Sequence, residues 1–322
     1  MSIALTFFLS LLNPAYNVII TKVKLHDERL FMQYLKAIIL GIVQGLTEFL
    51  PVSSSGHLSI FQHFMGISGE SSFSLSIMLH FGTLVAVFIV FYKTFLAIFK
   101  EIGLFFKELF TGKLQFKEIS DDRRMLYMLF LSCLPLLILM IPIGHDKKLM
   151  DIVSDITGDK DIIAEGVFFI ITAILLLLSS YFYNKRTADY LKKVNTKQAF
   201  MIGFAQLFAT LPGISRSGAT ITTGMLSKVD KEYMVRYSFV LGTPAILAAN
   251  LMDIKKLTET GSFDFGVSPA ILGIMVSCIV GILAIKLTVF LVKKDKFKIF
   301  GYYCLLLGIG VTVAGIVEKF IK

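Results

Sequence analysis

Six apolar segments of bilayer length recur along the chain, and they restrict its fold more than any other feature. Each is about as long as a helix that crosses a hydrocarbon core of roughly 30 Å. Because a backbone inside lipid must satisfy its own hydrogen bonds, we expect these segments to be helices. The chain is 55% hydrophobic, which excludes a water-soluble fold. The expected spans are Phe73–Ile98, Met125–Ile143, Ile162–Tyr183, Tyr233–Met252, Ser268–Val292 and Ile299–Phe320.

Basic residues between these spans predict the topology. The net charge of +9 comes from Lys and Arg in short loops, above all Lys100–Arg124, Asn184–Lys197 and Lys293–Lys298. The segments His145–Asp161 and Asp253–Gly266 lack such an excess. Because short loops rich in Lys and Arg stay in the cytoplasm, we place the first three inside and the other two outside. This distribution indicates a membrane protein with no nucleic-acid partner.

Residues 1–31 form an N-terminal extension whose status the sequence leaves open. It could be a signal sequence or an extra helix, or translation could begin at Met32. We assign it no function. Residues 32–322 are expected to form a single integral membrane domain, with one repeat at about 33–183 and a second at about 198–320.

The evidence for a repeat is a match between two polar interruptions of the apolar pattern. Residues 37–56 and 199–218 are identical at six of twenty positions, and the match continues from 80–83 to 240–243. Paired, interrupted hydrophobic segments in the two halves of a membrane protein point to its binding site. We therefore expect the functional residues in these two segments.

Each interruption is expected to be a re-entrant helical hairpin. Gln33–Gly66 is broken by Pro51, and Gln198–Ser227 is broken by Pro212 and Gly213. Three spans separate the two segments, so their hairpins should enter from opposite faces. The predicted fold is an all-α polytopic membrane protein with six transmembrane helices and two re-entrant hairpins in an inverted-topology repeat. The alternative is that both segments are kinked spanning helices.

The first hairpin carries a carboxylate at membrane depth. Gln44 and Glu48 are four residues apart and share a helix face. A charge in this environment is costly and marks a functional site by default. Glu48 could bind a divalent cation or act as a general base, with Gln44 adding an oxygen ligand. A purely structural hydrogen-bonding role for Glu48 is the alternative.

Hydroxyl groups follow the turn of this hairpin. They belong to Ser53, Ser54 and Ser55. Together with free backbone N–H groups at a helix N-terminus they would form an anion site, and His57 in the first turn could reach its ligand. His63 and His80 lack comparable neighbours, and we interpret them as structural.

The second hairpin adds a positive charge. Its polar residues are Ser215, Arg216, Ser217 and Thr220. An arginine at membrane depth needs an anionic partner, and its planar guanidinium suits a phosphate. The two hairpins together fit phosphoryl transfer. Because the site is expected inside a membrane, the substrate should be a phosphate on a lipid.

These motifs resemble the undecaprenyl-diphosphate phosphatase (bacitracin-resistance) family. The resemblance rests on Gln44–Glu48, Pro51–His57 and Pro212–Thr220. It implies hydrolysis of undecaprenyl diphosphate to undecaprenyl phosphate and inorganic phosphate, which recycles the lipid carrier for cell-wall synthesis. It also implies a multi-pass protein of the bacterial plasma membrane, an active site that faces the outer side, and a divalent cation, Mg²⁺ or Ca²⁺.

The resemblance also assigns roles. It implies that Glu48, Ser54, His57 and Arg216 are catalytic, that Ser53, Ser55, Ser215, Ser217 and Thr220 bind phosphate, and that Glu48 and Gln44 hold the metal. Many relatives have Glu where this chain has Gln44. Our preferred hypothesis makes Ser54 the nucleophile, but the motifs do not decide between Ser54 and His57.

Several alternatives remain at this stage. A transporter or flippase of the polyprenyl phosphate would use the same architecture to bind rather than cleave. The acid-phosphatase superfamily is discounted, because residues 217–226 contain no further His after Ser-Arg. The expected partners are the polyprenyl diphosphate lipid and the bilayer, and a homodimer is left open.

Overall fold

The computed structural model of the chain describes residues 14–66, 70–112, 119–143, 148–149, 162–184, 193–260 and 266–321. Over these residues the chain is helical, and the only extended pairing is an isolated bridge between Pro142 and Lys148. The expected all-α class is confirmed. The elements are α2 (Pro14–Phe49), α3 (Ser54–Phe64), α4 (Glu70–Val90), α5 (Tyr92–Phe110), α6 (Asp121–Cys133), the 3-10 helix η1 (Leu134–Met140), α8 (Ile163–Asn184), α9 (Thr196–Phe208), α10 (Arg216–Leu226), α11 (Lys231–Thr260), α12 (Val267–Lys293) and α13 (Lys298–Ile321).

Six helices among the described residues are long and apolar enough to cross a membrane. Five of them coincide, to within a few residues, with expected spans, and the sixth is the second part of α2. They are Glu28–Phe49, Asp121–Met140, Ile163–Tyr183, Lys231–Leu251, Val267–Lys293 and Lys298–Ile321. Large apolar side chains on α12 and α13, such as Ile279 and Leu306, are more than half exposed, as a lipid-facing surface requires.

The segment Phe73–Ile98, expected to be one continuous helix, is broken. Helix α4 ends at Val90, and α5 leaves it at an angle of 86°. The physical reason is polarity, because α5 carries lysines at every seventh position, which lie on one side of a helix. These are Lys93, Lys100 and Lys107. A helix with three ammonium groups along one side cannot continue into hydrocarbon without a large cost.

Both predicted interruptions are present. Helix α2 ends at Phe49 and α3 begins at Ser54, while α9 ends at Phe208 and α10 begins at Arg216. Helix α2 also runs without a break through Met32, so no structural feature separates the N-terminal extension from the domain at that residue.

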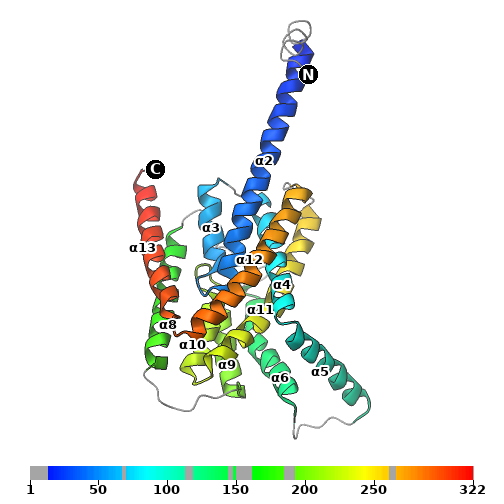
Figure 1. The fold of residues 1–322 in the computed structure, drawn as a ribbon, viewed down its shortest axis with the longest axis vertical. Coiled ribbons are helices and arrows are strands. Elements are labelled where there is room, and N and C mark those ends of the chain that lie inside the picture. The colour runs from blue at the N-terminus through cyan, green and yellow to red at the C-terminus, as the bar shows by residue number, and fades with distance from the viewer. Residues whose placement is uncertain are drawn as a thin grey trace.

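The two interrupted segments lie at opposite ends of the molecule and meet at their turns. Figure 1 shows α3 beside α2 in the upper part, with the N-terminus above them, and α9 with α10 in the lower part. Contact between the turns includes a hydrogen bond of 3.5 Å from the Ser217 hydroxyl to the Leu50 carbonyl. The polar residues of both segments therefore reach one place.

Small residues hold these helices close to their neighbours. A Cβ on Gly45 would lie 2.7 Å from the Ser277 carbonyl oxygen of α12, and one on Gly41 would lie 3.0 Å from the Gly273 carbonyl oxygen. Gly203 of α9 is likewise blocked, by the Pro135 ring of η1 at 2.9 Å. These three glycines are therefore close-packing positions between helices.

Candidate active site

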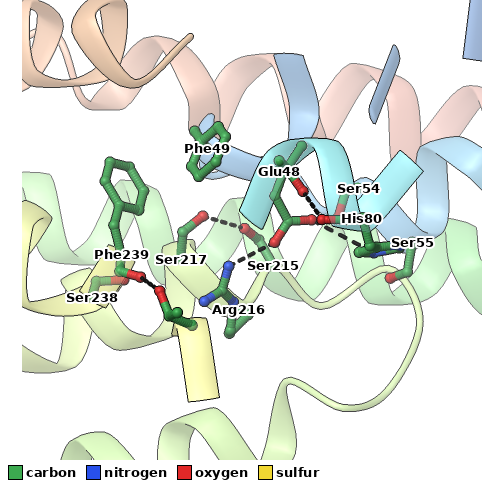
Figure 2. A network of polar contacts seen from close by, with 12 residues as sticks. Glu48, Phe49, Ser54, Ser55, His80, Ser215, Arg216, Ser217, Ser238 and Phe239 are labelled. Atoms are coloured by element: carbon green, nitrogen blue, oxygen red, sulfur yellow. Dashed lines mark hydrogen bonds and ion pairs between the residues drawn. The ribbon is translucent and has the colours of Figure 1, made fainter. Parts of the chain in front are cut away.

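Glu48 is the centre of a buried polar cluster. Its side chain is only 6% exposed, and both carboxylate oxygens accept hydrogen bonds. Arg216 donates Nη2 to Oε1 at 2.7 Å, and the Ser54 hydroxyl donates to Oε2 at 2.6 Å. Gln44 donates its amide to Oε2 at 2.9 Å. Figure 2 shows the first two contacts converging on the carboxylate from different helices.

The two residues with the shortest hydrogen bonds to Glu48, Ser54 and Arg216, occupy corresponding positions in the two copies of the repeat. Ser54 is the first residue of α3 and Arg216 is the first residue of α10. They are 162 positions apart, the same spacing that relates Ser53 to Ser215. The positive ends of two helix dipoles therefore point toward one carboxylate. An anion that enters this place meets both helix ends.

The serine that precedes each of these helices is a cap. Ser53 accepts a hydrogen bond from Gly56 N at 3.4 Å, and Ser215 accepts one from Gly218 N at 3.1 Å. In both copies the hydroxyl also lies 3.4 Å from the hydroxyl two residues further on. Ser53 has a φ of 70°, whereas Ser215 has a φ of −70°. The two copies therefore share the serine cap, but the backbone conformation at the cap residue differs.

Arg216 is packed against the backbone of α11. Its guanidinium lies where a Cβ of residue 242 would be, and only a glycine leaves that space free. The second nitrogen, Nη1, is buried and has no hydrogen-bond partner in the described part of the chain. This nitrogen is enclosed against α11 and has unused capacity to donate a hydrogen bond.

A cavity of about 370 Å³ opens beside this cluster. Its lining combines polar and apolar side chains, as a ligand with a charged head and a hydrocarbon chain requires. Its lining residues are Thr47, Glu48, Ser53, Ser54, Ser55, Ser76, Ile77, His80, Ala209, Thr210, Ile214, Ser215, Arg216, Ser217, Ala245, Ile246, Ala249 and Asn250.

Most of the predicted site residues line this cavity. The structure brings together Glu48, Ser53, Ser54, Ser55, Ser215, Arg216 and Ser217. Thr220 is not among the lining residues, and its hydroxyl lies 2.6 Å from that of Ser238 inside the protein. Gln44 lies behind Glu48, fully buried, and its Oε1 has no partner in the described residues.

His57 is directed away from the cavity. Its Nδ1 lies 2.7 Å from the Ser53 carbonyl oxygen, and its Nε2 lies 2.7 Å from the Tyr303 hydroxyl of α13. The ring is 4% exposed, stacked on Tyr303 and edge-on to Phe169. Both ring nitrogens are therefore occupied by protein groups. Our expectation that the imidazole reaches the ligand has no support from this geometry.

His80 is the residue that sequence analysis missed. We interpreted it as structural, but it lines the cavity with its Nε2 3.7 Å from Glu48 Oε2. The available signal was its place in the repeat, because His80 opens the four-residue match to 240–243. Asn250, which is 5% exposed, also lines the cavity and was not predicted.

The residues that line the cavity could hold a divalent cation only together with a phosphate ligand. The described residues contain no group of three His, Cys, Asp or Glu side chains that could hold a metal. Among the described residues that line the cavity, Glu48 is the only one with a carboxylate. Mg²⁺ is commonly bound by one or two carboxylates together with substrate phosphates and water. The site therefore fits a cation that Glu48 shares with a phosphate ligand rather than a cage of protein groups.

The fold and the site define an integral membrane protein with a cavity lined by two helix N-termini and an arginine–carboxylate pair. The family described as bacitracin resistance protein BacA matches residues 37–310, and the chain belongs to this family. An undecaprenyl-diphosphatase of Bacteroides thetaiotaomicron is 37% identical over 286 residues, 88% of this chain and 99% of the relative.

Two further relatives carry the same name. The undecaprenyl-diphosphatase of Alkaliphilus metalliredigens is 37% identical over 272 residues, 84% of this chain and 95% of the relative. That of Methanosphaera stadtmanae is 35% identical over 289 residues, 89% of this chain and 99% of the relative. The similarity therefore covers almost the whole length of each relative.

Proposed function

We propose that this chain hydrolyses undecaprenyl diphosphate to undecaprenyl phosphate and inorganic phosphate, which recycles the lipid carrier for cell-wall synthesis and confers bacitracin resistance. The observation that carries the proposal is the contact of Ser54 and Arg216 with one buried carboxylate at a cavity wall. The relatives named above support the substrate. The apolar lining residues Ile77, Ala245 and Ala249 suit the first prenyl units.

The geometry supports Ser54 as the nucleophile. Its hydroxyl lines the cavity and already donates to Glu48, which can accept the proton. The Ser54 oxygen bonds to the terminal phosphorus while the bond from this phosphorus to the bridging oxygen breaks. Undecaprenyl phosphate leaves with the bridging oxygen. Water then cleaves the phosphoserine, with Glu48 as the base, and releases inorganic phosphate.

Arg216 and the helix N-termini supply the positive field for this reaction. Arg216 lines the cavity, so its guanidinium can bind a phosphate oxygen while Nη2 stays with Glu48. The N-terminal ends of α3 and α10 add to this field where negative charge develops. Ser55 and Ser217 are the hydroxyls beside these ends that line the cavity and would donate to the phosphate.

A divalent cation, Mg²⁺ or Ca²⁺, would bind between Glu48 and the diphosphate. When bound, it would neutralise charge on the phosphate oxygens. Gln44 as a further ligand stays a prediction: its Oε1 has no partner in the described residues, but Gln44 does not line the cavity. Its amide donates to the carboxylate of Glu48.

We also propose that the two interrupted segments are re-entrant hairpins of an inverted repeat and that the cavity opens to the outer face. Three observations support this. The segments lie at opposite ends of the molecule, their turns touch, and their serine caps are alike. The lysine-rich end of α5 and the Lys293–Lys298 loop lie at the end of α9 and α10, which favours a cytoplasmic position for that end.

The direct test is phosphate release by purified protein in detergent. We expect the wild type to release phosphate from geranylgeranyl and undecaprenyl diphosphates, and EDTA to abolish the release. Glu48→Gln, Ser54→Ala and Arg216→Ala should each lower kcat about 10³-fold or more, because they remove the base, the nucleophile or the cation that binds the phosphate. The control is Arg236→Ala, since this arginine is exposed on α11 outside the cavity. A fully active Ser54→Ala enzyme would exclude Ser54 as the nucleophile.

A flippase is the second candidate, and the observation that favours it is the pair of interrupted segments that meet from opposite ends. Such a protein would bind the lipid phosphate at Arg216 without cleaving it. Reconstituted vesicles distinguish the two functions. Transfer of a labelled polyprenyl phosphate between leaflets without release of phosphate would favour the flippase, and release without transfer would favour the enzyme.

A further inference from the structure

The proposed reaction leaves one proton without a destination. After Ser54 transfers its proton to Glu48, the carboxyl group must lose that proton before it can act as a base on water. Arg216 and Gln44, the other partners of Glu48, donate and cannot accept it. A second proton acceptor has to lie close to Glu48 Oε2.

His80 is in the required position. It projects from α4 into the cavity, and its Nε2 lies 3.7 Å from Glu48 Oε2, as Figure 2 indicates. Its Nδ1 lies 2.7 Å from the Ser76 carbonyl oxygen, one turn earlier in the same helix. Because a carbonyl oxygen can only accept, Nδ1 carries the hydrogen and Nε2 presents its lone pair to the cavity.

The other histidine near the site does not meet these conditions. His57 has no free ring nitrogen, since one faces the Ser53 carbonyl and the other faces the Tyr303 hydroxyl. It is also buried outside the cavity lining. Of the histidines in the described part of the chain, His80 is the one whose ring lines the cavity beside Glu48.

We propose that His80 is a catalytic residue that contacts the diphosphate and carries the Ser54 proton from Glu48 to the departing oxygen. This inference rests on the proposed phosphatase function. The Ser54 proton passes to Glu48 Oε2 as the oxygen–phosphorus bond forms, and then to His80 Nε2. His80 gives it to the bridging oxygen, whose bond to the terminal phosphorus breaks. Glu48 is again a carboxylate, ready to activate water for the second step.

The first experiment measures contact without turnover. Protein with nitrogen-15-labelled histidine, in lipid nanodiscs, is titrated with geranylgeranyl methylenediphosphonate, in which a carbon replaces the bridging oxygen. We expect a shift of the His80 Nε2 resonance, assigned by its loss in His80→Gln. Saturable binding of this probe with no shift at His80 would overturn the proposal.

The second experiment measures turnover. We expect His80→Gln to lower kcat about 10²- to 10⁴-fold with little change in KM. His63→Gln is the matched control, because His63 pairs with Glu318 away from the cavity and should leave both constants unchanged. Melting temperatures establish that both variants fold. A His80→Gln enzyme with the wild-type kcat would overturn the proposal.

The two experiments separate the failure of this inference from failure of the phosphatase proposal. If wild-type protein binds the diphosphonate with a shift at His80 but releases no phosphate from the diphosphate, the phosphatase function is wrong and the His80 contact stands. If it releases phosphate and His80→Gln does so equally well, the function stands and His80 carries no proton.

Discussion

Gly242 controls the position of Arg216. The guanidinium occupies the space of a residue-242 Cβ, so Gly242→Ala must displace Arg216 from Glu48. A displacement of about 1 Å in a catalytic group can cost on the order of 10²-fold in rate. We therefore expect kcat to fall by about that factor while the fold persists, measured by phosphate release and thermal melting.

The control for this prediction is another helix glycine. A Cβ on Gly310 of α13 would meet no atom within 4 Å. Gly310→Ala should therefore keep wild-type activity. If Gly242→Ala also keeps it, Arg216 does not act from the position described here.

Individual residues differ in how far sequence predicts them. Glu48, Ser54 and Arg216 were predictable, because a charge or a hydroxyl beside a break in an apolar segment has few explanations other than a site. The orientation of His57 was not, since it depends on Tyr303, which is 246 positions away. His80 was missed because α4 is apolar on nearly all sides, so its periodicity does not reveal which face meets the cavity.

At the scale of elements, α5 is attached to α6 by a buried ionic cluster. Arg123 donates to Glu101 at 2.8 Å and binds both oxygens of Glu108, at 2.6 and 3.0 Å. Ser120, the cap of α6, also donates to Glu101. Arg123→Ala would leave two carboxylates without their cation, so we expect the free energy of unfolding to fall by about 3 kcal/mol.

Unfolding of the detergent-solubilised protein measures this effect. The comparison is Lys193→Ala, which removes the pair between Lys193 and Asp121, whose side chains are 46% and 73% exposed. An exposed pair of this kind contributes less than about 1 kcal/mol. Equal losses in the two variants would show that the cluster does not hold α5.

The hydrophobicity pattern of the sequence does not reveal the bend between α4 and α5. The apolar run from Phe73 to Ile98 was long enough for one span, and the breaks at Pro51 and Pro212 were marked by helix-breaking residues. No proline or glycine marks the bend at Phe91. It depends instead on the lysines of α5, two of which lie beyond Ile98, and on the contact of α5 with α6, which also lies beyond that run.

At the scale of the whole molecule, the hairpin proposal fixes the side of four chain positions. If both interrupted segments are re-entrant and inverted, Arg29 and Gly66, at the two ends of the first, face outward. Lys193 and Lys228, at the two ends of the second, then face the cytoplasm. Kinked spanning helices would put the ends of each segment on opposite sides.

Cysteine labelling in intact cells tests this arrangement. The native thiols, Cys133, Cys278 and Cys304, are half-buried or buried in spans and would first be replaced by alanine. Single cysteines at residues 29 and 66 should then react with a membrane-impermeant maleimide, and cysteines at residues 193 and 228 should react only after the membrane is opened. Labelling of residue 29 but not of residue 66 would contradict the first hairpin. Labelling of residue 228 but not of residue 193 in intact cells would contradict the second hairpin. A result that contradicts the first hairpin would also contradict the proposal that the cavity opens to the outer face.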